Sequence, residues 1–178
     1  MVMNNYQLNI DIAYKRWEDT LPNVYDICQT TFNAAIKYLK FNNLSKLLNV
    51  DKILSINLLL SDNNEIQSLN KEFRNLNKPT NVLSFANIDD PDFEQYIQHE
   101  EIIELGDIII AFETMVAEAD IKQISLQNHL CHLLTHGILH LFGYDHQQDD
   151  EAEKMEAIEI LILQQLNISN PYLEDNNV

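Results

Sequence analysis

The segment HGILHLFGYDH, residues 136–146, contains three histidines separated by three and then five residues. His136 and His140 are one helical turn apart, so both imidazoles lie on one face of a helix and can bind one metal ion. Gly143 can adopt the left-handed conformation that ends a helix, and the turn after it can bring His146 to the pair. Three imidazoles leave a tetrahedral ion with one open position for water or substrate. The spacing therefore predicts a catalytic metal site rather than a closed structural one.

A fourth histidine, His132, lies one turn before His136. At a rise of about 1.5 Å per residue, His132 and His140 lie about 12 Å apart along a helix axis and cannot bind the same ion. We therefore expect His132 in the core or in hydrogen-bonding contact next to the ligands. The alternative for the whole group is a set of ordinary surface or core histidines, but the spacing around a glycine turn favours the metal site.

The residue after His136 is Gly137. Zinc peptidases with an HExxH helix have a glutamate at this position, where it acts as the general base. Without that glutamate, the segment predicts a metal site but not standard peptide hydrolysis, and a metallohydrolase of another substrate remains an alternative. Zinc is the expected metal, although three imidazoles also suit nickel, copper or iron.

The net charge of −17 disfavours a protein that coats RNA by general electrostatic attraction. The charge is unevenly distributed: residues 1–78 hold nine Lys and Arg against eight Asp and Glu, whereas residues 79–178 hold two against twenty. Lys71, Arg74 and Lys78 form the last positive cluster before the acidic half. A small local site for an anion therefore remains compatible with the acidic chain.

Strands and helices alternate along the sequence. Alternating or continuous apolar runs predict strands, and apolar residues at helical spacing predict helices, one of them capped by Asp62 with Glu65 as its partner. The expected strands are 6–14, 53–61, 81–86 and 104–112, and the expected helices are 21–43, 62–74, 125–142 and 148–167. Residues 87–104 are expected to form a loop, and the tail after Asn167 is expected to fray. This order favours an α/β or α+β fold, with a small mixed sheet packed against several helices in a single domain spanning residues 1–178.

The sequence shows neither a secretory signal peptide nor an apolar run long enough to span a membrane. Cys28 and Cys131 match no metal or redox spacing, and we expect buried free thiols in a reducing compartment. The expected location is the cytoplasm.

Several segments in order along the chain resemble the YbeY family of bacterial endoribonucleases and rRNA maturation factors. Besides HGILHLFGYDH, they are LNKEFRNLNKPTNVLSF (69–85), LGDIIIA (105–111) and DDEAEKMEAIE (149–159). The resemblance extends from about Asp51 to Leu166. One departure is visible, because the family usually reads TDVLSF where this chain has Asn81. The loss of that acid removes a negative charge, and a helix cap or a hydrogen-bond acceptor near the site is a further candidate loss. The departure alone does not predict loss of activity.

The resemblance implies one α/β domain of zincin-like topology with one zinc ion held by His136, His140 and His146. It implies cleavage of single-stranded RNA in the maturation of the 3′ end of 16S rRNA and in ribosome quality control. The implied partners are rRNA and the small ribosomal subunit, with its proteins or assembly GTPases. The runner-up interpretation is a non-enzymatic assembly factor in which the metal only stabilises the fold.

The family's functional arginine matches Arg74, which would contact the scissile phosphate. Its alternative is a surface residue that interacts favourably with a helix end. Ser84 would line the same groove or serve the strand structurally. Asp107 and Asp145 are the candidates for a general base, but an aspartate beside a glycine turn often caps the local backbone instead.

The acidic helix after the histidines has two interpretations. Met155, Ile158, Leu161 and Ile162 form a stripe that faces the core, so most of the acids are expected to face solvent rather than to form a second metal site. Alternatively, the acidic face would contact a basic partner such as a ribosomal protein.

Overall fold

The computed structural model describes residues 5–145 and 148–173 of the chain. Within these residues, four strands form one sheet in the order β1-β2-β4-β3. β1 pairs in parallel with β2 and β2 with β4, whereas β3 pairs antiparallel with β4 and forms one edge. The strands are β1 (Tyr6–Ile12), β2 (Ile53–Ser61), β3 (Val82–Ala86) and β4 (Ile102–Ala111). All four predicted strands are therefore present, in a small mixed sheet as expected.

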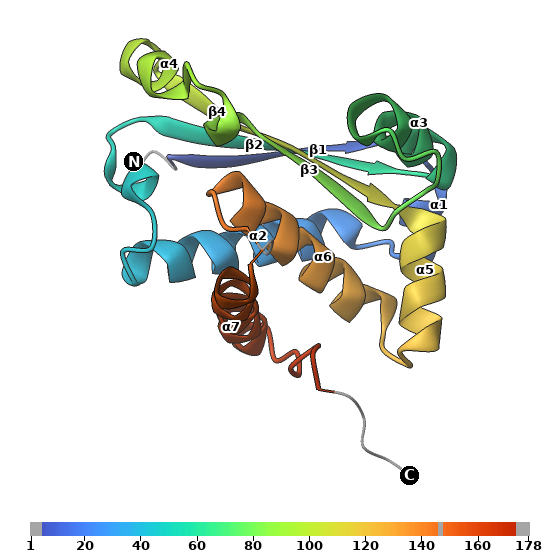
Figure 1. Cartoon of the computed structure of the whole chain (residues 1–178). Coiled ribbons are helices and arrows are strands. Elements are labelled where there is room, and N and C mark those ends of the chain that lie inside the picture. Colours follow the sequence, from blue (N-terminus) through green and yellow to red (C-terminus); the bar gives the residue numbers. More distant parts are fainter. Residues whose placement is uncertain (1–4, 146–147, 174–178) are drawn as a thin grey trace.

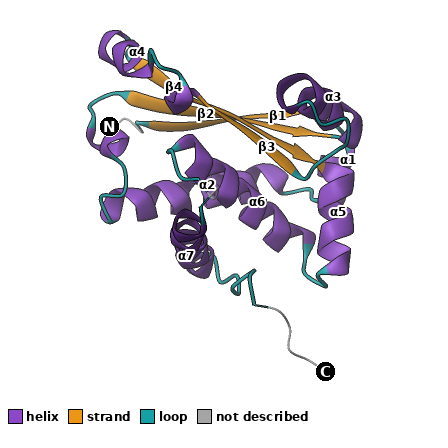
Figure 2. Ribbon diagram, in the orientation of Figure 1, coloured by secondary structure: helices purple, strands orange, loops and turns teal. Residues whose placement is uncertain are grey.

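The helices cover mainly one face of the sheet (Figures 1 and 2). α2, α6 and α7 lie on this face and α5 stands at one end of it, whereas α3 and α4 lie near opposite ends of the other face. Their bounds are α1 (Arg16–Thr20), α2 (Val24–Phe41), α3 (Asn63–Arg74), α4 (Phe93–His99), α5 (Phe112–Ile121), α6 (Leu126–Leu141) and α7 (Asp149–Gln165), with short 3-10 turns at Lys46–Asn49 and Asn87–Asp89. This architecture confirms the predicted α+β fold.

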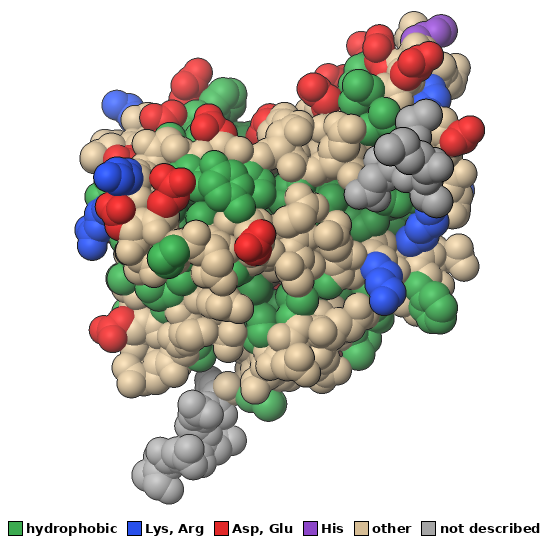
Figure 3. All heavy atoms as spheres, turned by 180° about the vertical axis from the view of Figure 1, so that it is seen from behind, with side chains coloured by type: hydrophobic (Ala, Val, Ile, Leu, Met, Phe, Trp, Pro, Cys, Tyr) green, Lys and Arg blue, Asp and Glu red, His purple; other side chains and the backbone are tan. Residues whose placement is uncertain are grey.

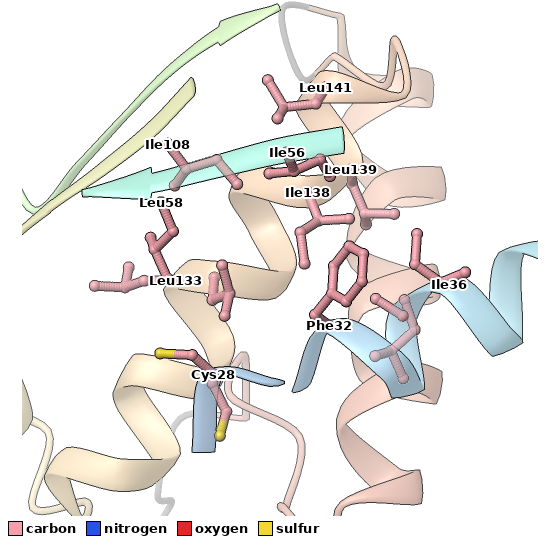
Figure 4. Packing of buried hydrophobic residues seen from close by; sticks show 14 of the residues in the cluster. Cys28, Phe32, Ile36, Ile56, Leu58, Ile108, Leu133, Ile138, Leu139 and Leu141 are labelled. Atoms are coloured by element: carbon pink, nitrogen blue, oxygen red, sulfur yellow. The ribbon is translucent and has the colours of Figure 1, made fainter. Parts of the chain in front are cut away.

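The main core lies between the sheet and α2, with α6 at its centre (Figure 4). Ile138 of α6 is fully buried between the strands and Phe32 of α2. Cys28 and Cys131 also belong to this core, and both are free thiols, as predicted. The core fixes α6 against the sheet, which matters because α6 carries the histidines.

Three helices, α1, α4 and α5, were not expected. α1 is a short helix that lies between the expected strand 6–14 and the expected helix 21–43, and it has no side-chain cap. Residues 87–104 do not form a plain loop, because they contain α4. The buried Phe93 anchors this helix in the core, and Lys52 donates to the carbonyls of Ile97 and Glu100 at its C-terminal end. α5 was not expected either, because it follows β4 directly and Ala111 gives it no side-chain cap. These three helices depend on tertiary contacts, which leave little local signal in the sequence.

The C-terminal region also differs. Residues 168–173 continue beyond α7 with Ile168 buried in the core, and the rest of the tail that was expected to fray lies outside the described residues. Leu161, expected to face the core, is 44 % exposed.

Charged side chains are unevenly distributed over the surface. Viewed from behind, acidic side chains line the upper rim of the molecule, and Lys and Arg side chains lie near its two sides (Figure 3). Of the helices described here, none has both the length and the apolar character needed to cross a membrane.

Candidate active site

The end of α6 determines where the histidines lie. Gly143 has a φ of +87°, and the Tyr144 N–H donates to the carbonyl of Leu139 at 3.1 Å while the Gly143 N–H donates to that of His140 at 2.9 Å. These two bonds form a Schellman motif, which ends the helix and turns the chain back. The helix stop predicted at Gly143 is therefore confirmed.

His136 and His140 point their imidazoles at the same place. Their Nε2 atoms lie 3.0 Å apart. The Nδ1–H of His136 donates to Glu159 Oε1 at 2.7 Å, and the Nδ1–H of His140 donates to the carbonyl of Tyr144 at 2.8 Å. Because Nδ1 carries the proton in each ring, both Nε2 atoms present a lone pair to the same place.

This geometry fits a metal ion. Two nitrogens bound at about 2.0–2.1 Å to one tetrahedral zinc lie about 3.3 Å apart, close to the separation of the two Nε2 atoms. A cation between the rings would also remove the repulsion between their lone pairs. The third predicted ligand, His146, lies outside the described residues. In residues 5–145 and 148–173 themselves, no group of three or more His, Cys, Asp or Glu side chains is arranged to hold a metal.

Glu159 is a site residue that the sequence interpretation missed. Its side chain is fully buried, and its two carboxylate oxygens interact with Nδ1 of His136 at 2.7 Å and Nε2 of His132 at 3.0 Å. Burial alone would raise the pKa of Glu159, but hydrogen bonds from His132, His136 and Tyr172 hold it at about 2. The carboxylate is therefore ionised and orients the ring of His136. His132 is buried, as expected, and contacts the other oxygen of the same carboxylate.

Glu159 is thus an exception to the expectation that most acids of this helix face solvent. A signal was present: the buried positions of α7 include Met155, Ile158 and Ile162, and Glu159 has the spacing of the same stripe. A charged residue at a core position of an amphipathic helix indicates a buried partner.

A pocket with a volume of about 610 Å³ opens beside the two histidines. It brings together five of the predicted site residues, namely Arg74, Ser84, His136, His140 and Asp145. Asp107 does not line it: this residue is exposed on β4 and accepts a hydrogen bond from Asn57 at 3.0 Å. Asp107 is therefore separate from the histidine site.

Arg74 reaches the pocket from the last turn of α3. The helix ends at Asn75, which has a φ of +57°, and the buried Asn70 side chain holds the following loop by donating to the carbonyl of Lys78 at 2.8 Å. Arg74 is exposed and forms no ion pair or hydrogen bond with any residue that the structure describes. Its guanidinium can therefore bind an anion at the pocket.

Asn81, which replaces the aspartate of the family pattern, lines the pocket and belongs to a hydrogen-bonded network with Glu118 and His129. Its side-chain oxygen accepts from the Val82 N–H at 2.7 Å, and its amide donates to both carboxylate oxygens of Glu118. Glu118 in turn contacts Nε2 of the buried His129 at 2.7 Å. Burial lowers the pKa of His129, against the opposing effect of Glu118.

Gly137 is required by packing. A Cβ atom at this position would lie 2.9 Å from Cγ2 of Ile108 on β4, so α6 approaches the sheet too closely for a larger residue. The position that carries the glutamate in zinc peptidases therefore has no room for it here.

Comparison with known proteins identifies the family. A family model described as Endoribonuclease YbeY matches residues 3–167. Two relatives named Endoribonuclease YbeY each align over 94 % of this chain. The protein of Paramagnetospirillum magneticum is 36 % identical, and the alignment covers 96 % of its length. The protein of Bartonella bacilliformis is 39 % identical, and the alignment covers 97 % of its length. The same name is carried by a protein of Francisella tularensis subsp. novicida, 46 % identical over 68 % of this chain and 74 % of its own.

A solved structure agrees on the fold. The solution structure of TM1509 from Thermotoga maritima matches with a TM-score of 0.51 and 21 % identity, over 96 % of this chain and 99 % of that one. Together with the family model and the curated relatives, the histidine segment and the pocket beside it lead to one conclusion: this chain belongs to the YbeY endoribonuclease family.

Proposed function

We propose that this protein is a metal-dependent endoribonuclease that hydrolyses single-stranded RNA in the pocket beside α6, with zinc held by His136, His140 and His146. One observation carries the proposal. The Nε2 atoms of His136 and His140 converge to 3.0 Å at the wall of the pocket that Arg74 also lines. A metal-binding pair and a guanidinium in one pocket are suited to a phosphodiester.

The residues of this chain have separable roles. His136 and His140 would hold the metal with their Nε2 atoms, and Glu159 and the Tyr144 carbonyl keep the proton on Nδ1. Zinc, when bound, lowers the pKa of a bound water toward about 7 or polarises a phosphoryl oxygen. Arg74 would bind the scissile phosphate through charge-assisted hydrogen bonds.

Electrostatics makes Arg74 central to substrate binding. The pocket wall also contains Asp89 and Asp145, which repel a phosphate, and Arg74 is the one Lys or Arg among its described lining residues. Phosphate binding therefore depends on Arg74 together with the metal.

The positions of Asp107 and Asp145, the two candidates for the general base, differ. Asp145 lines the pocket, whereas Asp107 lies away from it against Asn57. We therefore propose Asp145 as the residue that accepts a proton from the attacking water, and Ser84 of β3 would contact the substrate from the same pocket.

A peptidase role is disfavoured by the packing at Gly137, where the Cβ of a glutamate would collide with Ile108. For the biological setting, we propose the one implied by the family resemblance. This is maturation of the 3′ end of 16S rRNA and ribosome quality control in the cytoplasm, with the small subunit and its proteins or assembly GTPases as partners. The buried free thiols of Cys28 and Cys131 agree with a reducing compartment.

The test is cleavage of a single-stranded RNA that carries the 3′ end of 16S rRNA. Wild type, His140→Ala and Arg74→Ala are purified identically, and the zinc content and circular dichroism of each are recorded. We expect cleavage by wild type alone, with Arg74→Ala folded and metal-bound. Equal cleavage by all three would indicate a contaminating nuclease. No cleavage by metal-loaded wild type would favour the non-enzymatic assembly role.

The ends of the products separate two mechanisms. Attack by an activated water leaves no cyclic phosphate, whereas attack by the RNA 2′-hydroxyl leaves a 2′,3′-cyclic phosphate. Cyclic ends alone would contradict hydrolysis by a metal-activated water.

A further inference from the structure

The segment after α7 turns back over the helix that precedes it. Asn167 has a φ of +59°, and the Ile168 N–H donates to the carbonyl of Leu163 at 3.0 Å while the Asn167 N–H donates to that of Gln164 at 3.1 Å. These bonds form a second Schellman motif, which reverses the chain and buries Ile168 in the core. Residues 168–173 therefore have a defined course.

This course brings Tyr172 to the buried carboxylate. The Tyr172 hydroxyl donates to Oε2 of Glu159 and lies 3.1 Å from Nε2 of His132. Its ring meets the His132 ring edge-on, with centroids 5.3 Å apart and an interplanar angle of 84°. The Tyr172 N–H donates to Oδ1 of Asn170 at 2.9 Å, which holds the turn that presents the ring.

The contacts of Glu159 are divided between its two oxygens. Oε1 accepts a hydrogen bond from Nδ1–H of His136. Oε2 lies within hydrogen-bonding distance of Nε2 of His132 and accepts a hydrogen bond from the Tyr172 hydroxyl. Glu159 is fully buried, whereas Tyr172 is 38 % exposed, so the Tyr172 ring lies on the solvent side of the carboxylate. Removal of the hydroxyl would leave Oε2 with one contact fewer in a buried environment, and the carboxylate would gain freedom to rotate away from His136.

We propose that Tyr172 is a positioning residue for the metal site: its hydroxyl fixes Glu159, and Glu159 fixes the ring of His136 for metal binding. Tyr172 is not among the described residues that line the pocket, and it acts through two other side chains. The family model matches residues 3–167, so this contact is made by a segment outside the matched part of the chain. The inference rests on the metal site proposed above.

The test compares metal affinity in Tyr172→Phe, Tyr172→Ala and wild type. The dissociation constant for Zn²⁺ is measured by competition with a chromophoric chelator, and the free energy of unfolding of each metal-free protein by urea denaturation. Tyr25→Phe is the matched control, since Tyr25 is 48 % exposed on α2 and is not among the described hydrogen-bond partners of Glu159 or His132. We expect both Tyr172 variants to bind Zn²⁺ about ten-fold more weakly than wild type, and the control to match wild type.

The outcomes are distinguishable. A wild-type dissociation constant in Tyr172→Phe, with weaker binding only in Tyr172→Ala, would show that the ring merely packs and would overturn the positioning role. Lower stability with unchanged affinity in both variants would overturn it as well. Absence of Zn²⁺ binding by wild type would contradict the metal site of the proposed function, and this inference with it.

Discussion

The side-chain amide of Asn81 donates to both carboxylate oxygens of Glu118, at 3.1 and 3.0 Å. The family usually has an aspartate at this position, which would place a second carboxylate against Glu118. Asn81 keeps the acceptor that holds the Val82 N–H and replaces a repulsive contact with a charge-assisted hydrogen bond. The departure seen in the sequence therefore has a local structural reason in this chain.

Asn81→Asp should destabilise the protein, because two carboxylates would meet where one now accepts hydrogen bonds. We expect a loss of about 1.5–3 kcal/mol in the free energy of unfolding, measured by urea denaturation at pH 7.5. The double variant Asn81→Asp/Glu118→Gln should recover most of this loss. A double variant no more stable than Asn81→Asp would show that Glu118 is not the cause.

Arg74 should contribute to RNA cleavage through the geometry of its guanidinium as well as through its positive charge. Arg74→Ala should lower kcat/KM for RNA cleavage by about 10²–10³-fold. Arg74→Lys should give an intermediate value, because a lysine retains the charge but not the two-pronged contact to a phosphate. Lys71→Ala, a cation on the same helix that does not line the pocket, should cleave at nearly the wild-type rate. An equal loss in Lys71→Ala would point to general attraction of RNA instead.

Glu159→Gln should cost stability although the two side chains have nearly the same size. The new amide would face the donors of His136, His132 and Tyr172 in a fully buried place. We expect a loss of about 1.5–3 kcal/mol in the free energy of unfolding. Glu153→Gln, exposed on the same helix, is the control and should change little. Equal stability of the two variants would contradict the buried network.

Cys28 should make part of the stability sensitive to alkali. Burial, and then the neighbouring Cys131, raise the pKa of Cys28 from 9.0 to about 12. The unfolded chain loses this proton above pH 9 while the folded protein keeps it, so the stabilising effect is complete below pH 9 and is lost as the pH rises toward 12.

The measurement is urea denaturation of wild type and Cys28→Ala at pH 8 and pH 10. The stability of wild type relative to the variant should fall by about 1.4 kcal/mol between the two pH values. A constant difference would show that the thiol titrates equally in both states.

Much of the scaffold was predictable because its signals are local. Alternating apolar residues marked the strands, and the cap at Asp62, whose side chain accepts from the Glu65 N–H at 2.9 Å, marked the start of α3. Gly143 marked the end of α6, since few other residues adopt its conformation. The histidine spacing and the segment around Arg74 pointed to one site, and the pocket brings their described residues together.

The remaining features depend on contacts between distant residues. The helical spacing marks Glu159 as a core position, but its partners His136 and His132 lie 23 and 27 residues earlier, and no local pattern specifies them. Tyr172 reaches the same carboxylate only because Asn167 reverses the chain. Asp107 looked suitable by residue type, yet strand alternation places it on the face of the sheet away from the histidines.

The most direct test of the central claim is RNA cleavage as the metal is removed and restored. Wild-type protein is stripped with a chelator, dialysed, and assayed on single-stranded RNA before and after addition of one equivalent of Zn²⁺, with His140→Ala treated in the same way. We expect stripped wild type to be inactive, zinc to restore its cleavage, and His140→Ala to stay inactive throughout. Full cleavage by the stripped, metal-free protein would contradict metal-dependent hydrolysis at His136 and His140.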